Sequence, residues 1–147
     1  MINLGKSVDN VSKPKLLPED WYLVEVIEAP EAKPNSKGTG DNWVLSVKTV
    51  GNPEPEYNGF RLPVFLPLPS EEDENEYVQG QSLFDQKADR LITWVKAFDG
   101  IIDGENLDIE AGAQAYVYIV QQMYREELTN SINIFGNPPK HVDEFAG

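Results

Sequence analysis

The chain has 147 residues, of which 40% are hydrophobic and 25% charged, as expected for a single globular domain with its own core. It has no cysteine and no apolar run of the roughly 20 residues that cross a bilayer, which excludes disulfides, thiolate metal sites and a membrane-spanning helix. The net charge of −13 excludes a protein that is basic overall, as many duplex-binding proteins are.

The first half of the chain predicts three strands after an arm. Residues 1–15 are polar and lack the pattern of a signal peptide, so we expect a flexible arm and a cytoplasmic protein with no membrane association. Aromatic and β-branched residues predict strands over residues 21–29, 42–50 and 60–68. Pro63 and Pro67 lack a backbone donor, which places the third strand at an edge of the sheet or at bulges.

The second half predicts one helix and two more strands. The acidic block at residues 70–77 is expected to be a solvated loop. Ser82 as an N-cap, followed by apolar residues at helical spacing, predicts a helix over 83–98. Residues 113–122 and 131–135 predict the fourth and fifth strands, with a connection between them, and residues 140–147 predict a short acidic tail.

This order of elements indicates the fold. A mainly β protein with one helix is expected, and the order matches a five-stranded OB-fold-like barrel over residues 16–139, with the helix between strands 3 and 4. A β-sandwich with one helix fits the same order and stays open as the alternative.

The strand faces predict a binding site. Successive side chains of a strand point to opposite sides, so the apolar set of each strand is expected in the core. The other set combines cations and aromatic rings: Lys48, Arg61, Phe65, Tyr116 and Tyr118. Single-stranded nucleic acid needs this mixture, because rings stack with bases and cations follow the phosphates. Further cations and one ring in the connections are expected to extend this surface: Lys33, Lys37, Tyr124 and Arg125.

Signals of catalysis and of metal binding are weak. The single histidine, His141, lies in the predicted tail, and the chain has no phosphate-binding loop and no dinucleotide-binding fingerprint. The run from Asp99 to Glu110 has partly the spacing of a calcium-binding loop, but Ile101 stands where an oxygen ligand is needed. We therefore expect a binding protein and not an enzyme, with no cofactor and no metal.

Four segments carry a resemblance. They are LPEDWY at residues 17–22, SKGTG at 36–40 followed by WVLSV, GFR at 59–61 and NIF at 133–135. In this order, over roughly residues 16–139, the chain resembles short phage-encoded proteins related to phage OB-fold single-stranded DNA-binding proteins. The resemblance implies sequence-independent binding of single-stranded DNA in phage replication or recombination. It also implies recruitment of partner enzymes by an acidic C-terminal tip, of which residues 142–145 are a reduced version.

Two other functions remain open at this point. The first is a phage structural or adaptor protein, whose exposed rings would anchor other subunits. The second is an inhibitor that mimics DNA with its acidic surface. The sequence gives no indication of oligomeric state.

Overall fold

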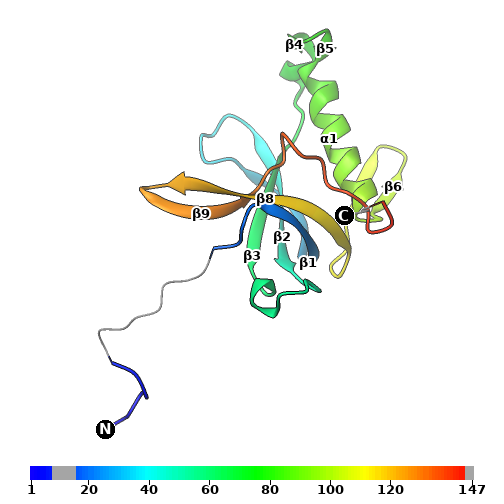
Figure 1. The fold of residues 1–147 in the computed structure, drawn as a ribbon. Helices are drawn as coiled ribbons and strands as arrows, with labels where there is room; N and C mark the ends of the chain where they lie inside the picture. Colours follow the sequence, from blue (N-terminus) through cyan, green and yellow to red (C-terminus); the bar gives the residue numbers. More distant parts are fainter. Residues whose placement is uncertain (8–15, 145–147) are drawn as a thin grey trace.

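A curved five-stranded antiparallel sheet with a helix against one face forms the body of the protein in the computed structural model, which describes residues 1–7 and 16–144 (Figure 1). The strands lie in the order β3-β2-β1-β8-β9. Their bounds are Asp20–Pro34 for β1, Asp41–Thr49 for β2, Arg61–Pro67 for β3, Gln114–Tyr124 for β8 and Glu127–Ile132 for β9. The prediction of a mainly β protein with one helix is confirmed.

The helix α1, Leu83–Ala97, begins where the sequence predicts. The hydroxyl of its N-cap Ser82 accepts a hydrogen bond from Asp85 N at 3.1 Å. The prediction placed the helix directly between the third and fourth strands of the sheet, but further elements separate α1 from both β3 and β8. One small hairpin comes before it, β4 (Tyr77–Val78) with β5 (Gln81–Ser82), and another comes after it, β6 (Ile101–Asp103) with β7 (Asn106–Asp108).

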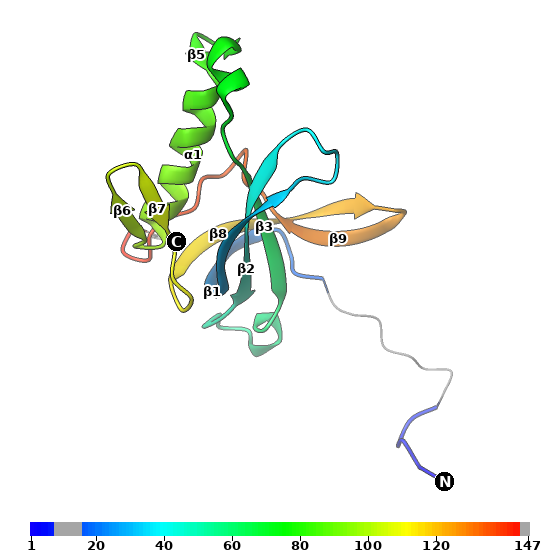
Figure 2. The ribbon, with the colours of Figure 1, turned by 180° about the vertical axis from the view of Figure 1, so that it is seen from behind.

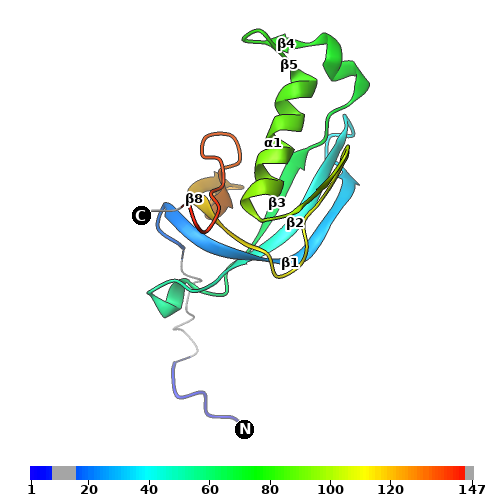
Figure 3. The same ribbon diagram turned by 90° about the vertical axis from the view of Figure 1, so that its right-hand side faces the viewer.

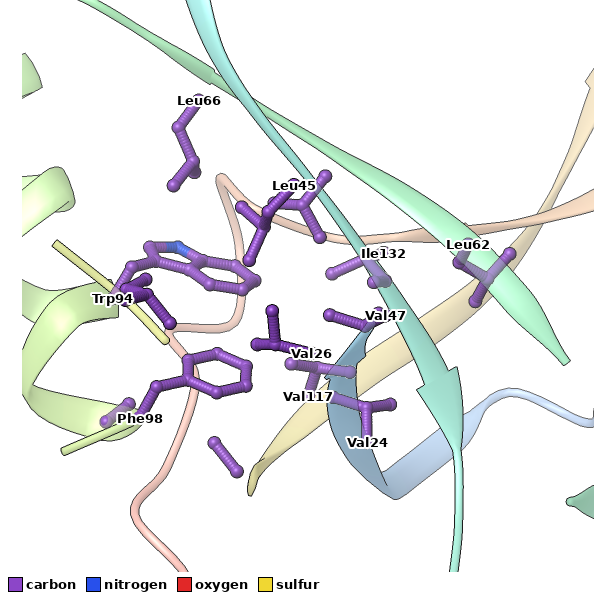
Figure 4. Close-up of a cluster of buried hydrophobic side chains, with 14 of the residues drawn as sticks. Val24, Val26, Leu45, Val47, Leu62, Leu66, Trp94, Phe98, Val117 and Ile132 are labelled. Atoms are coloured by element: carbon purple, nitrogen blue, oxygen red, sulfur yellow. The ribbon is translucent and has the colours of Figure 1, made fainter. Parts of the chain in front are cut away.

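The core lies between the sheet and α1. Trp94 and Phe98 project from the helical side onto the buried valines and leucines of the strands (Figure 4). The two rings stack on each other, with centroids 5.9 Å apart. Strand parity is confirmed, because most predicted inward side chains of β2, β3 and β8 are buried: Leu45, Val47, Leu62, Val64, Leu66, Ala115, Val117 and Ile119. Trp43 and Phe60 were also predicted to face inward, and they are partly buried against this core.

The predicted barrel is wrong, because the sheet does not close. Cα atoms of β3 and β9 come within 8 Å of one another, but no ladder joins the two strands. Leu68 N donates to Asp41 O, so the backbone N–H groups of every second residue back from Leu68 point toward β2. Pro63 and Pro67 belong to the other set, whose backbone nitrogens point away from β2. Two of the donors that β3 would offer to β9 are therefore missing.

The fifth strand was predicted too late in the chain. Residues 123–130, expected to be a connection, continue β8 and begin β9 across a two-residue turn. Both turn residues, Arg125 and Glu126, have positive φ angles, of 50° and 67°. Such turns usually contain asparagine or glycine, and this turn contains neither, so the sequence does not predict it.

The acidic block is not the solvated loop that was expected. Residues Glu71–Asn75 form a short 3-10 helix, in which Asp73 is buried. The Asp73 carboxylate accepts a hydrogen bond from Ser70 N at 2.9 Å and pairs with the Lys87 ammonium at 3.0 Å. These two contacts lower the pKa of Asp73 and attach the block to α1. Within the described residues, no helix has both the length and the apolar character that crossing a membrane requires.

Candidate nucleic-acid interface

A groove of about 490 Å³ lies where β3 and β9 fail to pair. We call it the amide groove, after its side-chain amides. Val64 and Ile132 belong to the core and line it as well, so the groove reaches down to the core. Its other lining residues are Asn42, Pro63, Phe65, Pro67, Val120, Gln122, Asn130, Ser131, Asn133, Ile134 and Phe135.

Two exposed rings line the amide groove. Phe65 comes from β3 and is 50% exposed, and Phe135 follows β9 and is 71% exposed. The Arg90 guanidinium of α1 lies over the Phe135 ring, 4.6 Å from its centroid. Partial burial lowers the pKa of Arg90, but an arginine stays charged at neutral pH. A cation therefore holds one of the two rings in place.

The amides of the groove fall into two pairs. Asn130 is occupied, because its side chain accepts from Leu17 N at 2.8 Å and donates to Leu17 O at 2.9 Å. Asn133 is also occupied, by the residues that follow it in the chain. The side-chain amides of Asn42 and Gln122 hydrogen-bond to nothing else in the part of the chain that the structure describes, so both are available to a ligand.

The amide groove is uncharged in an acidic protein. Among residues 1–7 and 16–144, no aspartate, glutamate, lysine or arginine lines it. The chain as a whole carries 25 acidic residues and a net charge of −13. An anionic ligand in this groove would thus meet no carboxylate in its walls.

Several predicted site residues lie beside the amide groove. Phe65 lines it directly. Arg61 and Tyr118 each lie two residues before a lining residue, Pro63 on β3 and Val120 on β8, and therefore on the same strand face. Tyr124 lies two residues after Gln122, near the hairpin tip, where the Arg125 guanidinium is 5.2 Å from the Tyr124 ring centroid.

The long β1–β2 hairpin carries two of the predicted lysines, near or beyond Asn42, which lines the amide groove (Figure 2). Lys33 lies directly opposite Asn42 in the ladder. Lys37 lies in the loop at the tip of the hairpin, which Asn35 closes by donating its backbone N–H to Gly40 O and accepting from Thr39 N. Both lysines are exposed and neither forms an ion pair with another described residue.

Other predicted residues are less available. Lys48 pairs with Glu25 at 3.8 Å. Tyr118 is partly buried, with its ring edge against Trp21 at a centroid distance of 5.6 Å. Tyr116 is also partly buried, and its backbone exchanges two hydrogen bonds of 2.9 Å with Lys140. The structure therefore does not assemble one open face from Lys48 and the two tyrosines.

The predicted acidic tail is attached to the body over its described part. His141 Nε2 lies 2.6 Å from a carboxylate oxygen of Asp99, just after α1, and this hydrogen bond raises the pKa of His141. Lys140 lies over the Trp21 ring at 4.9 Å. The exposed acids Asp143 and Glu144 follow, and the remaining residues, 145–147, lie outside the described part.

Sequence reasoning missed Phe135 and Arg90. Phe135 was assigned to the end of a strand, and Arg90 was given no role. Only the packing of α1 beside the segment after β9 brings the two together, and no spacing in the sequence encodes that contact. Figure 3 shows α1 running along the sheet, with the C-terminal segment beside it.

Comparison with models of known protein families and with curated proteins finds no match for this chain. The resemblance to phage proteins therefore stays a prediction from the quoted segments. Among the described residues, no group of three or more histidine, aspartate or glutamate side chains is placed to hold a metal ion.

Proposed function

We propose that the protein binds single-stranded DNA without sequence preference in the amide groove. The observation that carries the proposal is the groove itself, which has two exposed rings and no charged wall residue among the described residues, in a chain of net charge −13. Bases stack on aromatic rings regardless of their identity, at about 1–3 kcal/mol per base.

Cations at the margins of the amide groove supply the contacts to phosphates in this proposal. Arg90 lies on Phe135, Arg61 lies two residues from Pro63, and Lys33 lies opposite Asn42. None of the described carboxylates lines the groove, so these cations face no opposing charge within its walls. We further propose that the sheet is an open relative of the OB-fold, whose ligands bind across strands 2 and 3 and between the neighbouring loops.

Fluorescence anisotropy with labelled oligo-dT tests the proposal. We expect low-salt binding that weakens steeply with salt, and a loss of about 5- to 100-fold for Phe135→Ala and for Phe65→Ala, the equivalent of one lost stacking contact each. Tyr77→Ala is the matched control, because this 69% exposed ring lies on β4, away from the groove. Equal affinities for all four proteins, or no binding at micromolar concentration, would reject the proposal.

One observation favours a second function, protein docking by an adaptor. Met123, Tyr124 and Leu128 are exposed on the β8–β9 hairpin, and Met123 lies opposite Leu128 in the ladder. Exposed apolar side chains on a projecting hairpin are typical interface anchors. Such a role predicts that Met123→Ser abolishes partner capture and leaves oligo-dT affinity unchanged.

A further inference from the structure

A second groove, of about 870 Å³, lies between α1 and the β6–β7 hairpin. We call it the apolar groove. Phe84, Leu91 and Ile92 of α1 line it, together with Trp43 from β2 and Leu107 from β7. Among the described residues, none lines both this groove and the amide groove. A cleft of this size with apolar walls is a candidate interface.

Carboxylates border the apolar groove. Glu105 lines it, and Asp103 precedes the turn of the same hairpin. Asp85 and Asp89 each follow a lining residue of α1 by one position, and both are exposed. The cations Lys87 and Arg90 each precede a lining residue, but they contact Asp73 and the Phe135 ring. Lys96 is the one cation in the walls, among the residues that the structure describes. A segment that fills this groove is thus expected to be apolar and basic.

The N-terminal segment, residues 1–7, has that chemistry. Ile2 and Leu4 are 84% and 66% exposed, and Lys6 is its only charged side chain. Over residues 1–15, the sequence has three lysines and one aspartate, whereas the whole chain has a net charge of −13. The polar start of the chain therefore carries two exposed apolar side chains and a cation, in an acidic protein.

The point where the described body begins and the apolar groove lie on different elements of the fold. Leu17 is buried, and its backbone bonds to Asn130 and Gln121 fix the start of the body beside β8 and β9. The apolar groove is lined by α1 and the β6–β7 hairpin. Figure 2 shows these elements on the left, away from β9 on the right. A contact between two copies through these two different places would be heterologous, that is, head to tail.

We propose that residues 1–7 of one copy bind the apolar groove of a second copy. Ile2 and Leu4 pack against the apolar walls, and Lys6 pairs with the carboxylates of the border, chiefly Glu105. Charge complementarity and the exposed apolar side chains of the arm support this occupant. The association does not depend on the amide groove or on DNA.

Sedimentation velocity over a range of protein concentrations, at low salt and without DNA, tests the proposal. Wild-type protein is expected to form larger species as concentration rises. Leu4→Asp in the arm and Ile92→Asp in the groove should each raise the midpoint concentration at least tenfold. Val78→Asp is the matched control, because this 50% exposed side chain lies on β4 and lines neither groove.

A mixing experiment distinguishes head-to-tail binding from a general loss of solubility or folding. Leu4→Asp keeps an intact groove and Ile92→Asp keeps an intact arm, so an equimolar mixture should recover association but stop at two chains. Lys6→Glu should weaken association, and mixing it with the Glu105→Lys protein should restore association. This charge swap tests the proposal without Ile92→Asp, in case that variant does not fold.

Wild-type protein that stays monomeric at every concentration would overturn this proposal, and so would association that both Leu4→Asp and Glu105→Lys leave unchanged. A monomer whose own arm occupies its own groove counts as the first result. Oligo-dT affinity of the Leu4→Asp protein reports separately on the amide groove, so either proposal can fail without the other.

Discussion

The amide groove and the apolar groove differ in how they place charge. The first has exposed rings and amides and, within the described chain, no charged wall residue, and cations lie at its margins. The second has apolar walls bordered by carboxylates. A net charge is a sum over the surface, and among the described carboxylates one, Glu105, lines the apolar groove and none lines the amide groove. Overall charge is therefore a poor guide to what each groove binds.

The largest expected effect is a loss of stability, and it concerns the single core on which both grooves lie. Phe98 is 1% exposed and stacks on Trp94. Phe98→Ala should lower the free energy of unfolding by about 3–5 kcal/mol, because it removes buried apolar surface and leaves a cavity. Urea denaturation measures the change. A loss below about 1 kcal/mol would mean that helix and sheet do not form one packed unit.

A carboxylate introduced into each groove in turn separates their functions. Phe65→Asp should reduce oligo-dT affinity by about 100-fold, because a stacking ring is lost and a negative charge enters a neutral groove. Ile92→Asp places the same charge in the apolar groove and should leave oligo-dT affinity within about twofold. Anisotropy titrations measure both proteins. Equal losses would show that the two grooves do not act separately.

The cations beside the grooves give a smaller and more specific contrast. Arg61→Ala should make the slope of log affinity against log salt less steep by about 0.7–1, the value of one lost phosphate contact. Lys96→Ala removes a cation that lines the apolar groove and should leave this slope unchanged. Titrations with oligo-dT at several salt concentrations measure the slopes. The same change in both variants would point to a general charge effect.

The smallest expected effect is a pH dependence at the C-terminal segment. The hydrogen bond to Asp99 raises the pKa of His141 above its ordinary 6.5, so folding favours the protonated ring. Its contribution to the free energy of unfolding is therefore complete below pH 6.5 and is lost as pH rises through the folded pKa.

Chemical denaturation of wild-type protein and of His141→Gln between about pH 5 and 9 measures this contribution. The stability difference between the two proteins should shrink as pH rises. A difference that is constant with pH would show that the Asp99 contact does not depend on the charge of His141. Glu126→Gln serves as a control, because this exposed turn residue has no described contact with the segment.

Local patterns predicted many of the elements. Alternation in residues 42–50, 60–68 and 113–122 predicts strands that the structure contains, with the correct faces buried. The helix was also confirmed, because Ser82 and the apolar spacing specify it locally. The predicted bounds of the fifth strand were wrong, because the Arg125-Glu126 turn contains no residue type typical of such turns. The predicted solvated loop was also wrong, because Lys87 of α1 pairs with Asp73 of the acidic block.

The site was predictable only in part. The prediction of Phe65 and Arg61 on an outward face follows from strand parity, and both lie in or beside the amide groove. Tyr116 and Tyr118 share that parity, yet Lys140 and Trp21 lie against them. Parity states which way a side chain points, and it does not state which distant segment covers it.

The sequence by itself determined the secondary structure of most of the sheet, the helix and its cap, and the sides of the strands that enter the core. These are local properties, set by alternation, helical spacing and capping. Only the tertiary structure decided that β3 and β9 stay apart, that Arg90 meets Phe135, and that the described acids lie outside the amide groove. Those relations join residues far apart in the chain, and their contact follows from packing around one core.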